Sequence, residues 1–172
     1  MALAISGCAG TTTKSRPPAS ERPELGLEQL LSLPVQQGRA GLDQVAAFFY
    51  RRYAAHLENG RISYLDTERE GELVLADGYI LLNVSTSELQ LTPKPSELIT
   101  NVGKISFAVS KTPCFPLERF IQISGAQGPS PGAFGPSDYK RYYYRGTGIS
   151  VSAYVGYPDF ECIDSVNLNV IN

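Results

Sequence analysis

Residues 72–84 read ELVLADGYILLNV, and this stretch decides the fold class. Two runs rich in Leu, Ile and Val, 72–76 and 79–84, flank the dipeptide Asp77-Gly78. Such a dipeptide between apolar runs is typical of a type I′ hairpin turn, in which both central residues take a positive φ. The stretch therefore predicts two antiparallel strands that meet at Asp77-Gly78.

Further short runs of β-branched and aromatic residues extend the predicted sheet on both sides of this hairpin. Turn-rich segments such as 92–95 and 101–103 separate these runs. The segment 117–123 fits a short helix or a strand equally well. We predict a mostly antiparallel sheet with further strands at 61–65, 88–91, 105–109, 138–145, 149–155 and 166–170.

The residues before the sheet follow a helical period instead. Apolar side chains fall at i, i+3, i+4 and i+7 spacings over 42–57, at positions 42, 45, 46, 49, 53 and 57. A shorter helix over 25–33 should end at Pro34. We predict an α+β fold in which one long N-terminal helix packs against a mostly antiparallel sheet. Residues 25–172 are expected to form a single globular domain.

The composition excludes some classes of function. The chain has 172 residues, with 15 basic and 17 acidic side chains and a formal charge of −2. That balance lacks the basic excess that nucleic-acid binding requires, so we expect no nucleic-acid partner. No apolar run approaches the roughly 20 residues of a membrane-spanning helix.

The sequence Ile5-Ser6-Gly7-Cys8 resembles the lipobox of bacterial lipoproteins. The resemblance implies that Cys8 is lipidated and that residues 1–24 comprise a leader, this lipidation site and a flexible tether. Because Ala9 rather than Asp follows the cysteine, it also implies attachment to the outer membrane, facing the periplasm. Only seven residues precede Cys8, so either Met1 lies inside a longer leader, or the match is a chance one and Cys8 is a free thiol.

The other two cysteines, Cys114 and Cys162, lie in the body of the domain. In the oxidising compartment that a lipoprotein reaches, we expect them to form a disulfide. The alternative is a pair of buried free thiols.

The motifs of common enzymes and metal sites are missing from the sequence, so we expect no catalytic activity, no metal and no cofactor. The single histidine, His56, is predicted to be half-buried in the last turn of the long helix. The alternating acids Asp66, Glu68, Glu70 and Glu72 suit a solvated strand face better than a calcium site. An enzyme built on carboxylates, such as Glu68 with Glu70 or Asp164, is the weakest of the functional hypotheses.

Two segments are candidates for binding a partner protein. In a strand over 138–145, Arg141, Tyr143 and Arg145 would lie on one face and Tyr142 and Tyr144 on the other. Tyr and Arg concentrate binding energy at interfaces, although Arg stacked on Tyr over a core strand would give the same pattern. Phe134 lies in the Gly/Pro-rich segment 125–137, where it either covers the core or projects toward a partner.

Small lipid-anchored domains without catalytic motifs are similar, as a class, to periplasmic immunity proteins that neutralise type VI secretion lipases or cell-wall hydrolases. The similarity implies a non-enzymatic, periplasm-facing lipoprotein that binds a toxin, with the contact at Phe134 and the strand 142–145. The alternative is an assembly lipoprotein of a secretion or pilus machine, which would use its sheet edge to join a neighbour.

Overall fold

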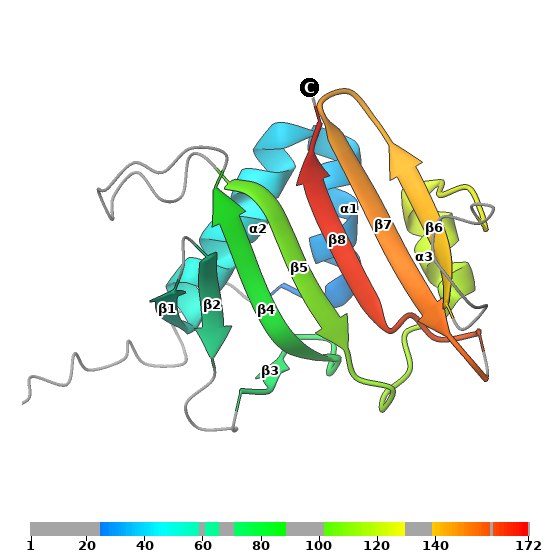
Figure 1. Cartoon of the computed structure of the whole chain (residues 1–172), viewed down its shortest axis with the longest axis horizontal. Helices are drawn as coiled ribbons and strands as arrows, with labels where there is room; N and C mark the ends of the chain where they lie inside the picture. The colour runs from blue at the N-terminus through cyan, green and yellow to red at the C-terminus, as the bar shows by residue number, and fades with distance from the viewer. Residues whose placement is uncertain are drawn as a thin grey trace, which may run out of the picture.

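A computed structural model describes residues 25–58, 61–65, 71–88, 102–129, 139–158 and 160–171. These residues form an eight-stranded sheet (Figure 1). Seven of its strands lie in the order β1-β2-β4-β5-β8-β7-β6, and the eighth, β3, pairs with β4. All the strand pairs are antiparallel. The strands are β1 Ala54–Glu58, β2 Arg61–Leu65, β3 Leu73–Val74, β4 Ile80–Glu88, β5 Val102–Val109, β6 Tyr139–Arg145, β7 Ile149–Gly156 and β8 Ser165–Val170.

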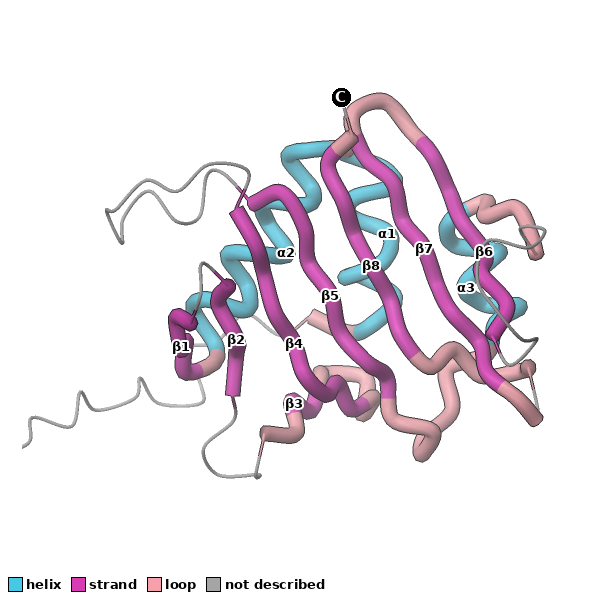
Figure 2. The backbone as a smooth tube through the Cα atoms, viewed as in Figure 1, coloured by secondary structure: helices cyan, strands magenta, loops and turns pink. Residues whose placement is uncertain are grey.

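Three helices cover one face of this sheet and form a second layer (Figures 1 and 2). They are α1 Leu27–Gln37, α2 Arg39–Arg52 and α3 Leu117–Ser124. Helix α1 lies between the other two and contacts β7, while α2 contacts β5 and α3 contacts β7. The predicted α+β class with a mostly antiparallel sheet is confirmed, but two consecutive helices and α3 make up the helical layer in place of one long helix.

Helix α1 does not end at Pro34, as the sequence predicted, but runs through it to Gln37. Pro34 is buried, and at this interior position it removes one backbone donor and crowds the carbonyl of Leu30 without ending the helix. The break comes at Gly38, whose φ of 58° is reached easily only by glycine. Helix α2 then crosses so close to α1 that a Cβ on Gly41 would collide with the Leu33 carbonyl.

Helix α2 is shorter than predicted and ends at Arg52 rather than Leu57. Tyr53 turns the chain into an extended conformation, and residues 54–58 form β1 against β2. Pairing in the sheet gives hydrogen-bond partners to backbone groups that would have none in the last turn of a helix. His56 is therefore not a half-buried helix residue: it lies exposed on β1, opposite Ser63.

The predicted hairpin exists, with Leu73 opposite Leu81 and Val74 opposite Ile80. Its turn is not of type I′, because Asp77 keeps a negative φ and only Gly78 is positive, at 84°. The Gly78 N–H bonds to the Leu75 carbonyl at 3.0 Å, which makes a three-residue loop. The Asp77 carboxylate is then free to accept the Leu27 N–H at 2.6 Å and so caps α1.

Strand β4 continues to Glu88, where the sequence predicted a break after Val84 and a new strand at 88–91. Its register against β5 shifts between Leu82 and Ser85, at a bulge that contains Asn83 with a φ of 52°. The bulge reverses which face the following side chains take. Val84 and Thr86 consequently point into the core, and Ser85 and Ser87 point away from the helices. Strand β5 also begins earlier than predicted, at Val102.

The segment 117–123, which the sequence left open, is helical in α3. Just before it, Cys114 forms a disulfide with Cys162, which confirms the predicted pair. The bond closes a loop of 48 residues, for which the chain-entropy model gives about 4 kcal/mol of stabilisation. On the outer surface Arg119 donates to Glu28 through Nε at 2.6 Å and Nη2 at 2.7 Å, which joins α3 to α1.

The hydrophobic core fills the space between the two layers. Phe49 of α2 lies at its centre, with the rings of Phe48, Tyr53, Tyr64 and Phe107 at centroid distances of 5.3 to 6.3 Å. The strands contribute every second side chain to this core, as in Ile105, Phe107 and Val109 of β5. On the opposite face, Leu82 and Ala108 lie at one end of β4 and β5, and the rows beyond them are mostly polar. This face is the candidate site.

Candidate functional site

The face of the sheet turned away from α1, α2 and α3 is here called the open face. The strand registers align one residue from each of seven strands in a row across it. These side chains are small or polar at almost every position. The row, which we call the polar row, runs His56, Ser63, Ser85, Ser106, Asn167, Ser152 and Tyr143.

A neighbouring row carries most of the cations of the open face. It runs Arg61, Ser87, Lys104, Asn169, Ser150 and Arg145 from β2 to β6. Arg141 lies on the same face of β6, opposite Tyr154. At the margin of the sheet Asp164 is paired with Lys111 at 3.4 Å. In register, Glu58 of β1 lies opposite Arg61 at the end of this row. Among the described side chains of the open face, cations outnumber carboxylates, in a chain whose net charge is −2.

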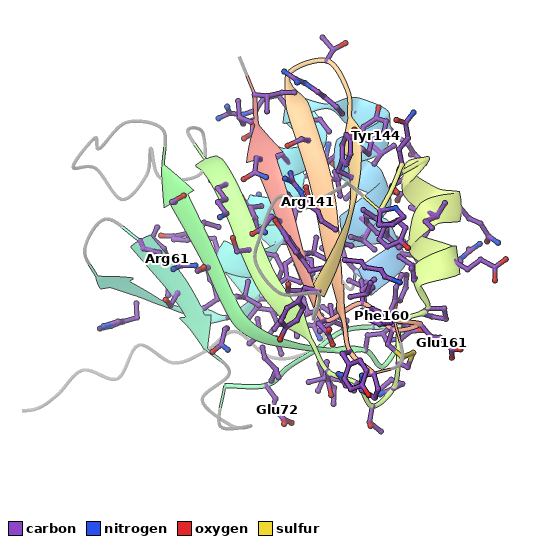
Figure 3. All side chains as sticks on the ribbon, turned by 45° about the vertical axis from the view of Figure 1, so that its right-hand side comes forward. Arg61, Glu72, Arg141, Tyr144, Phe160 and Glu161 are labelled. Carbon is purple, nitrogen blue, oxygen red and sulfur yellow. A yellow bond between two sulfur atoms is a disulfide. The ribbon has the colours of Figure 1, made fainter. Side chains whose placement is uncertain are left out.

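Arg141 is held in place by its neighbours on β6 and β7. Its Nη2 donates to Ser152 Oγ at 3.0 Å, and Ser152 is fully buried beneath it. The guanidinium also lies 5.9 Å from the ring centre of Tyr143 and 6.0 Å from that of Tyr154, within cation–π range. Arg141 is thus a preorganised hydrogen-bond donor at the β6 side of the sheet (Figure 3).

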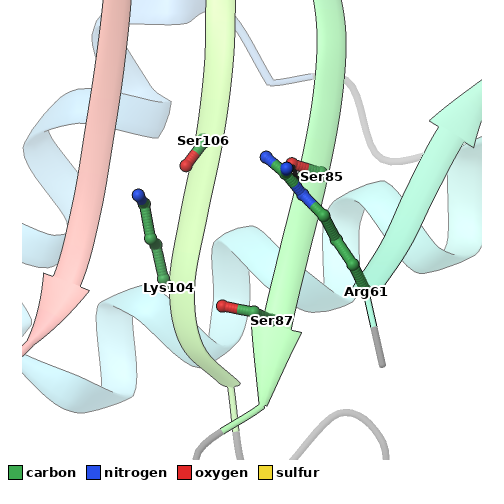
Figure 4. A pocket seen from close by; sticks show the side chains of 5 residues that line it. All are labelled: Arg61, Ser85, Ser87, Lys104 and Ser106. Carbon is green, nitrogen blue, oxygen red and sulfur yellow. Dashed lines mark hydrogen bonds between the residues drawn. The ribbon is translucent and has the colours of Figure 1, made fainter. Parts of the chain in front are cut away.

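A shallow pocket lies at the other side of the open face, over β2, β4 and β5 (Figure 4). Its volume is about 200 Å³, and it is lined by Arg61, Ser85, Ser87, Lys104 and Ser106. Arg61 Nε donates to Ser85 Oγ at 2.8 Å, while Ser106 Oγ donates to Asn167 Oδ1 at 2.8 Å. The bulge at Asn83 creates this pocket, because it turns Ser85 and Ser87 to the open face.

The strand β6 follows the predicted alternation. Arg141, Tyr143 and Arg145 lie on the open face, whereas Tyr142 and Tyr144 are partly buried against the core. Among the described partner-binding residues, Arg141, Tyr143 and Arg145 therefore share the open face, and Tyr142 and Tyr144 do not lie on it. Phe134 lies outside the described residues, as do Cys8, Asp66, Glu68 and Glu70; Glu72 is exposed.

Strand β6 is at the edge of the sheet, yet its outer side is not free throughout. Gln127 bridges to Tyr143, with N–H···O distances of 2.8 and 2.9 Å in the two directions. A guest strand along β6 would have to displace this bridge. The geometry therefore favours the open face over the β6 edge as a contact surface.

Exposed aromatic side chains gather at one end of β6 and β7. Tyr139 is 69% exposed and Tyr157 is 72% exposed. Phe160 lies 6.3 Å from Tyr157 and carries the Lys140 ammonium 4.1 Å above its ring. Of these aromatic side chains, Tyr139 lies on the open face with Arg141 and Tyr143, whereas Phe160 is partly buried against the core.

Sequence reasoning missed the pocket residues and most of the polar row. A signal exists in the alternate polar positions of each strand, as in Ser150 and Ser152 or Asn167 and Asn169. The strands that carry Arg61, Ser85 and Lys104 are adjacent in the sheet, but sequence spacing does not reveal the register that brings these side chains together.

Neither a family model, a curated protein nor a solved structure matches this chain. Within the described ranges, no helix is long and apolar enough to cross a membrane. The same part of the chain contains no group of three or more His, Cys, Asp or Glu side chains arranged to hold a metal ion.

Proposed function

We propose that this chain is a non-enzymatic, periplasm-facing lipoprotein that binds another protein through the open face. The observation that supports it most directly is Arg141, held over Ser152 between Tyr143 and Tyr154. An arginine that is already ordered loses little conformational entropy when a partner binds. Tyr and Arg are also the side chains most often found at binding hot spots.

The charge of the open face indicates the kind of partner. Arg61, Lys104, Arg141 and Arg145 all lie there, while the whole chain carries a formal charge of −2. A surface whose charge opposes that of its own chain selects an acidic partner surface and discriminates against copies of itself. The partner is therefore proposed to present carboxylates toward β6 and β7.

A matched pair of tyrosines tests this proposal. Tyr143 on the open face and Tyr50 on α2 are both 36% exposed. With the partner recovered by crosslinking in envelope extracts, Tyr143→Ala should weaken its binding by about 2 kcal/mol, as at a hot spot. Tyr50→Ala should leave binding unchanged. Equal loss in both variants, or loss in neither, would contradict binding at the open face.

The salt dependence of binding tests the proposed charge complementarity. Binding of the recovered partner should weaken as salt shortens the range of the interaction, to a Debye length of about 10 Å at 0.1 M. Arg145→Glu should reduce the association rate more than the lifetime of the complex, because rim charges act mainly on encounter. A partner whose association rate is independent of salt would not be the acidic protein proposed.

The proposed location depends on Cys8 and is tested separately. Palmitate labelling of the full-length gene product should mark the protein, and Cys8→Ser should abolish the label. Unlabelled protein in both cases would remove the lipid anchor and leave the binding proposal to stand on the open face alone.

Within this proposal the partner is a secreted toxin of the lipase or cell-wall hydrolase class, and the chain acts as its immunity protein. Periplasmic expression of a toxin encoded beside this chain should be lethal without the chain and tolerated with it. Tyr143→Ala should restore the toxicity, and Tyr50→Ala should not. The alternative, an assembly lipoprotein that uses its sheet edge, would require displacement of Gln127 from Tyr143 if that edge is β6, but not if it is β1.

A further inference from the structure

The pocket over β2, β4 and β5 has a chemical character that the proposed protein contact does not require. Two cations, Arg61 and Lys104, and three serines line it, and no carboxylate is among the described lining residues. The two cations approach from opposite sides of the serines, Arg61 from β2 and Lys104 from β5 (Figure 4). Like charges repel, so such a pair is more stable when an anion lies between its members.

Arg61 is oriented toward this space by its neighbour. Its Nε donates to Ser85 Oγ at 2.8 Å, which fixes the plane of the guanidinium beside the pocket. Ser85 as a residue is 4% exposed, and its hydroxyl oxygen is the acceptor in this bond, so the hydroxyl proton is not used in it. The two terminal nitrogens of Arg61 add a planar fork of donors.

Lys104 provides the second cation, from the β5 side of the pocket. Its side chain is exposed on β5, opposite Ser87 on β4 and Asn169 on β8. Within the described residues it makes no ion pair. Its ammonium group therefore contributes a full positive charge and up to three donors to the pocket.

The size and the donor set together define the ligand. A volume of about 200 Å³ is below the roughly 300–1,000 Å³ of pockets that enclose drug-sized molecules. Donors that converge from three strands are better satisfied by the several oxygens of a tetrahedral anion than by the two of a planar carboxylate. We propose that Arg61, Lys104, Ser85 and Ser87 form a binding site for a phosphate-class oxyanion, either a free ion or a terminal phosphoryl group.

The proposal is tested on the purified full chain by following amide NMR signals during titration with inorganic phosphate at constant ionic strength. The amides of Ser85, Ser87 and Ser106 should shift and saturate in the millimolar range. Arg61→Gln and Lys104→Gln should each weaken the affinity by about tenfold, as loss of one charge-assisted donor does. Arg145→Gln is the matched control, because it removes the same charge from the same face.

The control lies at the far side of the sheet. β6 is separated from β5 by three strand spacings and from β2 by five, each of about 4.8 Å. Arg145 is therefore more than a Debye length of about 10 Å from both cations of the pocket. Phosphate affinity in Arg145→Gln should therefore remain within twofold of the unmodified chain. Folding of each variant is checked by its urea unfolding midpoint.

Three results would overturn the site: no saturable shift, an equal loss of affinity in Arg145→Gln, or acetate binding as tightly as phosphate. A parallel titration with glycerol 3-phosphate distinguishes the sources. Tighter binding than inorganic phosphate supports a terminal phosphoryl group, and weaker binding supports the free ion. None of these measurements involves a protein partner, so they test the pocket independently of the proposed function.

Discussion

The two faces of the sheet use the same strands for opposite purposes. On β5, Phe107 is buried against the helices, while its neighbour Ser106 lies on the open face and bonds to Asn167. The helix-covered face gains its stability from apolar burial. The open face carries hydroxyl, amide and cationic groups, which do not stabilise the fold by apolar burial. We therefore interpret the polar residues of the open face by what they bind.

The largest difference in unfolding free energy is expected between variants of these two neighbouring residues. Phe107→Ala should lower the free energy of unfolding by about 4 kcal/mol, because it leaves a cavity in the centre of the core. Ser106→Ala should lower it by no more than about 1 kcal/mol, the value of one hydrogen bond. Urea unfolding of both variants gives the comparison, and similar losses in the two would show that the open face is also part of the stabilising core.

A smaller effect is expected where the helical layer is joined to the sheet. Asp77→Ala removes the acceptor for the Leu27 N–H and should cost about 1 kcal/mol of unfolding free energy. Asp77→Asn, which keeps an oxygen at that position, should recover most of the loss. If the two variants are equally destabilised, the hydrogen bond is not the reason that Asp77 matters.

Cations of the open face should contribute almost nothing to stability. Arg145→Gln is expected to change the free energy of unfolding by less than about 0.5 kcal/mol, since the side chain is exposed. A change above 1 kcal/mol in the same urea experiment would contradict the division of roles between the two faces.

The smallest effect is a pH dependence on the outer surface of the helical layer. The hydrogen bond from Arg119 lowers the pKa of the Glu28 carboxyl below its ordinary value of 4.5. The pair therefore stabilises the fold above pH 4.5, and this contribution is lost as the pH falls through the lowered pKa. Because both groups are at the surface, the change is small.

Urea midpoints measured across that acid range should fall less steeply in Glu28→Gln than in the unmodified chain. Glu118→Gln, an exposed carboxyl in the first turn of α3, is the control and should retain the full dependence. A flatter profile in Glu118→Gln alone would show that the pH dependence comes from Glu118, which would contradict the prediction for Glu28.

Local pattern was sufficient for most of the fold. The period of two separated Arg141 and Tyr143 from Tyr142 and Tyr144 correctly, because side chains alternate along any strand. The same rule failed on β4, where the bulge at Asn83 reverses the alternation and moves Ser85 and Ser87 to the open face. A positive φ at Asn is tolerated but not required, so the residue type alone does not predict the bulge.

The helices show the same division between local and tertiary causes. The apolar stripe identified α2, but its end depended on pairing between β1 and β2, which local spacing does not encode. Pro34 was predicted to stop α1, yet the helix continues through it to Gln37, with the proline buried. The pocket at Arg61 and Lys104 could not be predicted at all, because it depends on two strand registers at once, β2 with β4 and β4 with β5.

The place of β8 has a consequence for how the protein is made. β8 is the latest strand in chain order, and it alone pairs with both β5 and β7. Arg61 and Lys104 lie on one side of it, and Arg141 and Arg145 on the other. Until residues 165–170 emerge, no strand joins β5 to β7, so the two halves of the sheet are in contact only through the helical layer. The continuous row of side chains across the open face therefore exists only once β8 has paired with both neighbours.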